Sequence, residues 1–379
     1  MIIGEFVDTY PPEVDGVGRV TQAYCSTLRQ MGHTAYYVAP SSPTAENHYD
    51  FPLVLSGSLA FPGELFRVGT PAFDRKYRAQ LDAIPFDIVH AHSPFLAWSE
   101  AHRVSKKRDI PLVSTFHSKY RDDVRAKTHS RAIAALAVKG IVQQYEKCDA
   151  VWTLNNATAD VLREYGYRGK LLIMPNGTNL EPLDPRVRQA MAEKLRLPQR
   201  DLKLLFVGQH NYKKNLHGVL GACKILQEKG QPFQLIMVGD GPDYDAIVQE
   251  SKDLGLGDRC HFMGFMQDRA ALMALYDMAD LFVFPSLYDN APMVLREAAS
   301  MGTPAVLVKG SCSAEGVEDG VNGFISRDES AGAIAAAILR SLPDIPRVGH
   351  QAQRTIPISW ESILEQVLGE YEKLIAGRR

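Results

Sequence analysis

Two acidic residues, Asp289 and Glu297, lie eight positions apart on either side of a predicted helix start. The apolar run 281–284 is typical of a buried strand, residues 285–291 form a loop, and Pro292 is expected as the first residue of the helix. Asp289 then lies at the carboxyl end of a strand, near helix N–H groups that favour a negatively charged ligand. This arrangement suits the binding of a polar ligand that carries phosphate.

Glu297 shares a face of that helix with apolar residues three or four positions away, among them Met293 and Met301. A carboxylate on an apolar face needs a partner. A structural alternative stays open, in which Asp289 or Asn290 caps the helix and Glu297 forms a salt bridge. The segment alone does not decide between the two.

Lys214 belongs to a polar loop that follows the apolar run 202–207. A fixed cation there can stabilise negative charge on a departing phosphate, although a solvated lysine is the commoner fate of such a residue. The loop 15–18 (DGVG) follows the first apolar run, and its glycines let backbone N–H groups approach a phosphate. Without the full GxGxxG spacing, this loop alone is a weak signal.

Three histidines occur at or near the ends of predicted strands. His117 follows the run 112–116, where a ligand-binding role and a structural role are about equally expected. His90 and His92 alternate onto one face of their strand, but two ligands without a third are thin evidence for a metal site. We therefore predict structural or acceptor-facing roles for these two residues, and no metal.

Two series of apolar runs alternate with helical patterns, which is typical of βαβ units and parallel sheets. The Pro- and Gly-rich stretch 175–185 separates them. We predict an α/β protein with two Rossmann-like doubly wound domains, residues 1–178 and 179–357. A final helix within 358–379 can pack back on the first domain. Chemistry is expected at the carboxyl ends of the strands.

The composition fits a globular protein of two domains, with 379 residues, 45% hydrophobic and 23% charged. A net charge of −2 disfavours nucleic acid as a partner, although residues 61–140 carry about six more basic than acidic residues. Five scattered cysteines indicate reduced thiols. With no evident leader or spanning segment, we expect a cytoplasmic protein that can associate peripherally with the inner face of the membrane.

The sequence of residues 284–306 (FPSLYDNAPMVLREAASMGTPAV) resembles the carboxylate-x7-carboxylate region of the retaining glycosyltransferases of the GT-B fold, family 4. Further resemblances follow in order along the chain: PEVDGVGRV at 12–20, STFHS at 114–118, MPNGTNLE at 174–181, FVGQHNYKKN at 206–215, VGDGPD at 238–243, HFMGF at 261–265 and ISWESI at 358–363. The resemblance implies two Rossmann-like domains that face each other across a cleft. It also implies transfer of a hexose from a nucleoside diphosphate, without a cofactor.

The resemblance assigns roles to residues at the matching positions. It implies catalytic roles for His117, Lys214 and Asp289. Donor contacts are implied for Gly16, Gln209, Lys214, Met266, Asp289, Asn290, Ala291, Met293 and Glu297. Acceptor contacts are implied for Arg19 and Tyr120.

The chain departs from the family pattern at four donor positions. Asp289 replaces the usual Glu, and Ala291 and Pro292 replace Phe and Gly, so that one backbone N–H is missing. Gln209 replaces the usual Arg, which leaves diphosphate binding more dependent on Lys214. Donor contacts are therefore expected to be rearranged.

Within the family, these sequence motifs are most similar to those of diacylglycerol glucosyltransferases and phosphatidylinositol mannosyltransferases. They favour a UDP-hexose donor and a membrane glycerolipid acceptor such as diacylglycerol, on an anionic membrane surface. Alternatives are a soluble or polysaccharide acceptor, and a catalytically silent nucleotide-sugar-binding protein. An NAD-dependent oxidoreductase is disfavoured by the missing GxGxxG and ribose-binding acid.

Overall fold

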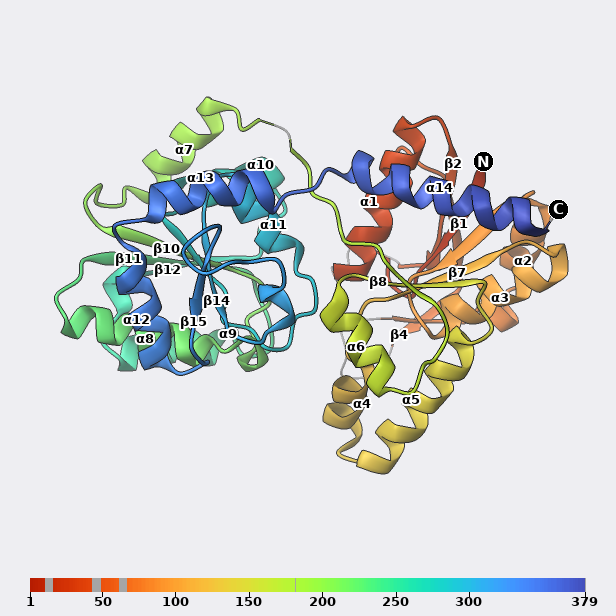
Figure 1. Cartoon of the computed structure of the whole chain (residues 1–379), viewed down its shortest axis with the longest axis horizontal. Helices are drawn as coiled ribbons and strands as arrows, with labels where there is room; N and C mark the ends of the chain where they lie inside the picture. Colours follow the sequence, from red (N-terminus) through yellow and green to blue (C-terminus); the bar gives the residue numbers. More distant parts are fainter. Residues whose placement is uncertain (11–15, 43–48, 61–66, 181, 379) are drawn as a thin grey trace. The chain divides into compact units, whose positions relative to one another are not determined.

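The computed structural model describes residues 1–10, 16–42, 49–60, 67–180 and 182–378, and the side chain of Lys127 is not described. The chain forms two compact units (Figure 1). Unit 1 comprises Met1–Asn176 and Trp360–Arg379, and unit 2 comprises Gly177–Ser359. Both borders lie two residues from the predicted domain limits.

Unit 1 is built on a parallel sheet of seven strands in the order β3-β2-β1-β6-β7-β8-β9. Its strands are β1 (Ile2–Phe6), β2 (Thr34–Pro40), β3 (Leu53–Ser56), β6 (Ile88–Ala91), β7 (Leu112–Phe116), β8 (Ala150–Thr153) and β9 (Leu171–Ile173). A small antiparallel pair, β4 (Ser58–Ala60) and β5 (Arg67–Gly69), forms a separate two-stranded sheet.

The helices of unit 1 connect and flank these strands (Figure 1). They are α1 (Gly16–Gln30), α2 (Arg75–Ala83), α3 (Leu96–Arg108), α4 (Tyr120–Thr128), α5 (Arg131–Tyr145) and α6 (Asn156–Glu164), with a short 3-10 turn η1 at Pro71–Phe73. The last helix, α14 (Trp360–Arg378), packs against α1 although hundreds of residues separate them in sequence. Unit 1 is thus completed by the end of the chain.

Unit 2 has a parallel sheet of six strands in the order β12-β11-β10-β13-β14-β15. Numbered within this unit, the order is 3-2-1-4-5-6, that of a doubly wound Rossmann sheet. The strands are β10 (Leu202–Val207), β11 (Phe233–Val238), β12 (Cys260–Gly264), β13 (Leu281–Val283), β14 (Ala305–Val308) and β15 (Phe324–Ser326).

The helices of unit 2 are α7 (Pro185–Leu195), α8 (Leu216–Glu228), α9 (Tyr244–Asp253), α10 (Arg269–Met278), α11 (Met293–Ser300), α12 (Ala331–Ser341) and α13 (Ile345–Thr355). Short 3-10 turns are η2 (Tyr212–Lys214), η3 (Gly257–Arg259) and η4 (Cys312–Ala314). Side-chain caps start several of these helices. Asp268, for example, accepts from the backbone N–H of Ala271 and fixes the start of α10.

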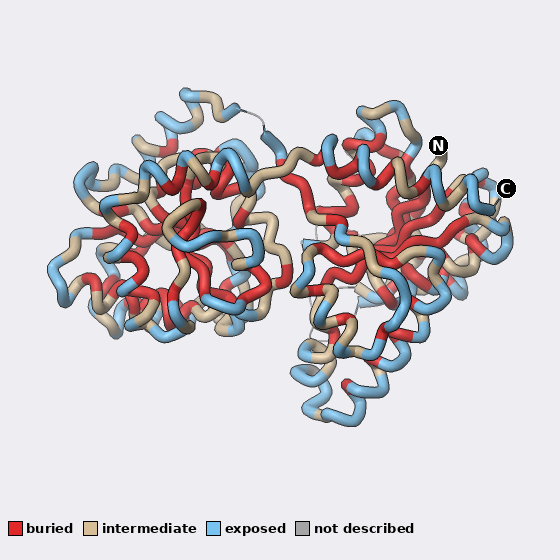
Figure 2. The backbone as a smooth tube through the Cα atoms, in the orientation of Figure 1, coloured by how far each residue is buried: buried red, intermediate tan, exposed pale blue. Residues whose placement is uncertain are grey.

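Parallel strands covered by helices on both faces are buried and consist of near-continuous apolar runs. All six residues of β11 are buried, as are all four of β14. Figure 2 shows the buried backbone concentrated in the middle of each unit. The sheets therefore act as rigid supports for the loops at their carboxyl ends.

The predicted fold class is confirmed, with some differences at element ends. The helix after β13 begins at Met293, and Pro292 is its N-cap with φ −67° and ψ 125°. The prediction that Pro292 is the first helical residue was wrong because its ψ is extended. Among the described residues, no helix combines the length and apolar character that crossing a bilayer requires.

Candidate functional site

The candidate donor residues of unit 2 gather around the point where its strand order reverses. There β10 and β13 are direct neighbours, and their carboxyl ends lead into the loops that carry Lys214 and Asp289. Ligands of doubly wound sheets bind in the crevice beyond such a switch point. The sheet topology thus places both side chains where a ligand is expected.

Lys214 and Asp289 form an ion pair between the Nζ and Oδ1 atoms. The other carboxylate oxygen of Asp289 accepts a hydrogen bond of 2.6 Å from the hydroxyl of Ser286, and both charged side chains are largely shielded from solvent. A partly buried cation is held in place by such a carboxylate. Lys214 can exchange this partner for a phosphate without moving into water.

Glu297 is buried, and both of its carboxylate oxygens have protein partners. The guanidinium of Arg269 donates to Oε1 at 2.8 Å, and the hydroxyl of Tyr276 donates to Oε2 at 3.1 Å. Burial disfavours the charged guanidinium, but the carboxylate of Glu297 outweighs this and raises the pKa of Arg269. The partner that we expected for the buried Glu297 carboxylate is therefore Arg269. This is the salt bridge of the structural alternative given above.

The other predicted donor residues of unit 2 follow strands β10, β12 and β13. Gln209 is exposed and Asn290 is buried. The remaining three are half-buried: Met266 after β12, Ala291 before α11 and Met293 at its start. These positions lie in or beside loops at strand ends, and their contacts with a donor remain predictions.

Gly239 allows the loop after β11 to lie against the loop after β10. Its φ is +130°, and a Cβ atom there would stand 1.9 Å from the carbonyl oxygen of Gly208. Only glycine tolerates both the dihedral angle and the contact. Gly239 of the VGDGPD motif therefore has a packing role, because it lets this loop lie against the loop that follows β10.

His117 and His92 lie together in unit 1, near the switch point between β1 and β6. The Nε2 atom of His117 is 3.1 Å from Nδ1 of His92, whose Nε2 is 2.8 Å from a carboxylate oxygen of Glu5. Burial, and then the neighbouring His92 and His90, lowers the pKa of His117 well below its usual range. His117 is therefore a neutral ring at physiological pH.

His90 points to the same side of β6 as His92, as the alternation predicted. Its Nδ1 is 2.7 Å from the hydroxyl of Tyr371 in α14, and its Nε2 is 2.7 Å from that of Thr115. Glu5 supplies the third charged or basic group that the sequence reasoning had missed beside the two histidines. The absence of a metal remains a prediction. The argument that His90 and His92 lack a third possible ligand no longer supports it, because Glu5 lies beside them.

The remaining predicted residues of unit 1 are spread over its first and fourth helices. Gly16 is the exposed first residue of α1, Arg19 is half-buried one turn later, and Asp15 with the rest of the loop lies outside the described residues. Tyr120 starts α4 and is buried between the rings of Phe95 and Phe116. Its acceptor contact remains a prediction.

The predicted catalytic residues thus divide between the units, with His117 in unit 1 and Lys214 and Asp289 in unit 2. Sequence reasoning missed Arg269, Tyr276 and Glu5. Only Glu5 had a usable signal, since it is a lone charged residue in an apolar buried strand.

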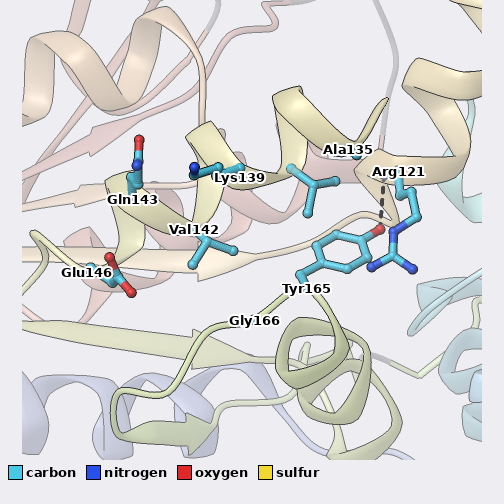
Figure 3. Close-up of a pocket in the computed structure, with 9 residues that line it drawn as sticks. Arg121, Ala135, Lys139, Val142, Gln143, Glu146, Tyr165 and Gly166 are labelled. Carbon is cyan, nitrogen blue, oxygen red and sulfur yellow. Dashed lines mark hydrogen bonds between the residues drawn. The ribbon is translucent and has the colours of Figure 1, made fainter. Parts of the chain in front are cut away.

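A groove of about 430 Å³ opens on unit 1 between α5 and the end of α6 (Figure 3). Arg121 and Lys139 supply cationic groups to its wall, and Glu146 supplies an anionic one. The guanidinium of Arg121 lies 4.5 Å from the ring centre of Tyr165, and its backbone N–H donates to the Tyr165 hydroxyl at 2.9 Å. The groove therefore presents a basic side chain held against an aromatic wall.

Comparison with known proteins gives two family models, one for each half of the chain. Residues 14–182 match the model described as Glycosyltransferase Family 4, and residues 187–353 match Glycosyl transferases group 1. Each model covers the strand-end loops of one unit.

Two curated relatives align over most of the chain. It is 24% identical over 358 residues to alpha-monoglucosyldiacylglycerol synthase of Streptococcus pneumoniae, covering 91% of this chain and 80% of the relative. It is 25% identical over 366 residues to phosphatidyl-myo-inositol mannosyltransferase of Mycolicibacterium smegmatis, covering 91% and 86%.

The fold is similar to that of HepE of Anabaena, whose crystal structure is in complex with UDP-glucose. The TM-score is 0.79 at 18% identity, and the match covers 98% of this chain and all of that one. From the two family models and the relatives, the chain belongs to the GT-B glycosyltransferases of family 4 and is a glycosyltransferase enzyme.

Proposed function

We propose that the protein transfers a hexose, with retention of configuration, from a UDP-hexose to the hydroxyl of a membrane glycerolipid such as diacylglycerol. The observation that carries the proposal is the Lys214–Asp289 ion pair, with buried Glu297 on the following helix, at the switch point of unit 2. The named relatives act on glycerolipids, and the structural neighbour holds UDP-glucose. Both support the choice of donor and acceptor.

In the proposed reaction, the bond between the anomeric carbon and the diphosphate oxygen breaks as the acceptor oxygen bonds to the same face of that carbon. The acceptor proton passes to the departing phosphate. Lys214 exchanges Asp289 for the diphosphate and stabilises its growing negative charge. Asp289, once released, accepts a hydrogen bond from a hydroxyl of the hexose. Glu297 accepts a hydrogen bond from a hydroxyl of the ribose. No protein nucleophile is needed.

The acceptor side of the proposal is supported by two sets of exposed apolar side chains on unit 1, each with basic residues nearby in the sequence. Phe73 is 90% exposed and lies next to the exposed Arg75 and Lys76. On α5, Leu136 is 72% and Ile133 is 50% exposed, whereas Ala134 and Val138 face the core. Such a mixture suits the surface of an anionic leaflet.

A donor screen by product mass tests the proposed function. The protein is incubated with UDP-glucose, UDP-galactose, GDP-mannose and diacylglycerol, phosphatidylinositol or a soluble sugar. We expect hexosyl-diacylglycerol with a UDP-hexose. Product on the soluble sugar alone would overturn the lipid acceptor, and the absence of product or free UDP in every reaction would favour a silent binding protein.

Membrane association is tested by flotation with vesicles that contain an anionic lipid. Replacing Ile133 and Leu136 by Ser is expected to lower the partition coefficient for the vesicles at least about 100-fold, because each buried aliphatic side chain contributes about 1.5–3 kcal/mol and every 1.4 kcal/mol is a factor of ten. Ile173→Ser removes a partly exposed aliphatic side chain of the edge strand β9 and is the matched control. A native protein that stays wholly in the soluble fraction would contradict this prediction.

A further inference from the structure

The carboxylate of Glu5 lies in the middle of unit 1 and is fully buried. Burial alone raises the pKa of Glu5, but the charges and hydrogen bonds of His90 and His92 outweigh it and hold this pKa at about 2. Glu5 is therefore an anion at neutral pH, and its oxygens can only accept hydrogen bonds. Any ring nitrogen that bonds to it must carry a proton.

This requirement fixes the ring of His92. Its Nε2 lies 2.8 Å from Oε2 of Glu5 and donates to it. If the ring of His92 is neutral, this is its only proton, and Nδ1 of His92 is then an acceptor. Nδ1 faces Nε2 of His117 at 3.1 Å, and His117 must donate in that contact. The proton on the His117 ring is thereby assigned to Nε2.

The rest of the network satisfies Glu5 without disturbing this direction. The hydroxyl of Tyr371 donates to Oε1 of Glu5 and accepts from Nδ1 of His90. The hydroxyl of Thr115 donates to Nε2 of His90. Burial, and then His92, lowers the pKa of His90 to about 4, which keeps this ring neutral. Each of these contacts thus has one donor and one acceptor.

Glu5, His90 and His92 are also close enough to be considered as metal ligands. Zinc ligands about 2.0–2.1 Å from a tetrahedral ion lie about 3.3 Å from one another. The 2.8 Å between Glu5 and His92 is shorter than this and fits a hydrogen bond. His90 also has a hydroxyl partner at each ring nitrogen. A hydrogen-bond relay explains these contacts better than a metal site.

We propose that His92 is neutral, and that Glu5 and His92 are positioning residues that hold His117 in its Nε2–H tautomer. The lone pair is then on Nδ1, and through this atom His117 recognises a hydroxyl that donates a hydrogen bond. That this hydroxyl belongs to the transferred hexose rests on the function proposed above. The tautomer itself does not depend on it.

Nitrogen-15 NMR of the imidazole rings in the full chain tests the relay without any substrate. We expect a neutral His117 with its proton on Nε2 in the native protein. Glu5→Leu and His92→Phe each remove a link of the relay, and a mixture of both His117 tautomers is expected. A native His117 with its proton on Nδ1, or a single unchanged form in a folded His92→Phe protein, would overturn the proposal.

Thr115→Val is the matched control, because it removes a buried hydroxyl of the same network outside the path from Glu5 to His117. It is expected to leave the His117 tautomer unchanged. Thermal unfolding identifies any variant that does not fold, and having two relay variants keeps the test decisive. A mixture of His117 tautomers in folded Thr115→Val would contradict the assigned path.

Transfer kinetics give a second, separate readout. His92→Phe is expected to lower kcat/KM about two- to tenfold, the contribution of one hydrogen bond, and to have no further effect in a His117→Ala background. Additive effects would contradict the relay. If no donor supports transfer but the native tautomer is as expected, the proposed function fails while the relay stands.

Discussion

Glu297→Ala is expected to weaken UDP binding about 10- to 150-fold. A hydrogen bond to a charged acceptor contributes about 1.5–3 kcal/mol, and every 1.4 kcal/mol is a factor of ten in affinity. Glu297 is already held by Arg269 and Tyr276, so that its carboxylate is ordered before the nucleotide arrives. Isothermal titration calorimetry with UDP measures the change. Glu297→Gln, which keeps the shape and one acceptor oxygen, should have a smaller effect.

The matched control is Asp277→Asn on the neighbouring helix α10, where Asp277 pairs with Arg188 at the surface. Surface ion pairs contribute about 0–1 kcal/mol, and this one touches none of the predicted donor residues. The control should therefore bind UDP like the native protein. An unchanged UDP affinity in folded Glu297→Ala would remove Glu297 from the donor site.

Lys214→Ala is expected to lower kcat about 10²- to 10³-fold, with a smaller change in KM. The reason is that a preorganised group aimed at developing charge acts mainly in the transition state, and the loss of one such group costs about that factor. Here Lys214 has the greater share, since the usual second cation is replaced by the exposed Gln209. Steady-state kinetics with the donor identified by the screen measure both constants.

The adjacent Lys213 offers a control of the same residue type. It is exposed, and its ammonium lies 5.0 Å from the ring centre of Tyr288. Lys213→Ala should keep kcat within about twofold of the native value, because exposed charges are largely screened by solvent. Equal losses in both variants would show that the catalytic role of Lys214 is wrongly assigned.

Much of the fold could be predicted because buried parallel strands leave an unambiguous apolar run. The predicted limits of β7 and β10 agree with the structure to the residue. The strands β3 and β15, each at the edge of its sheet, were missed. Short edge strands depend on a neighbouring strand for their hydrogen bonds, which a local pattern does not reveal.

The candidate site was less accessible to sequence reasoning. Asp289 and Lys214 were predicted because both lie in motifs that resemble those of the family. Their ion pair was not predicted, because it joins residues 75 positions apart. Arg269 is the first residue of a helix with an ordinary surface pattern, and only the fold brings it to Glu297, 28 positions later. Partner choice for a buried charge is a tertiary property, whereas the need for a partner follows from the residue type alone.

The return of α14 to unit 1 has a consequence for synthesis on the ribosome. Six of its residues are buried, among them Trp360 and Tyr371, and Tyr371 touches both Glu5 and His90. Translation proceeds from the amino terminus at about 5–20 residues per second, and domains generally fold as units while it proceeds. Unit 2 is contiguous and can fold during translation. Synthesis of unit 1 begins before that of unit 2 and is completed after it, so the polar centre of unit 1 stays incomplete until α14 has left the ribosome.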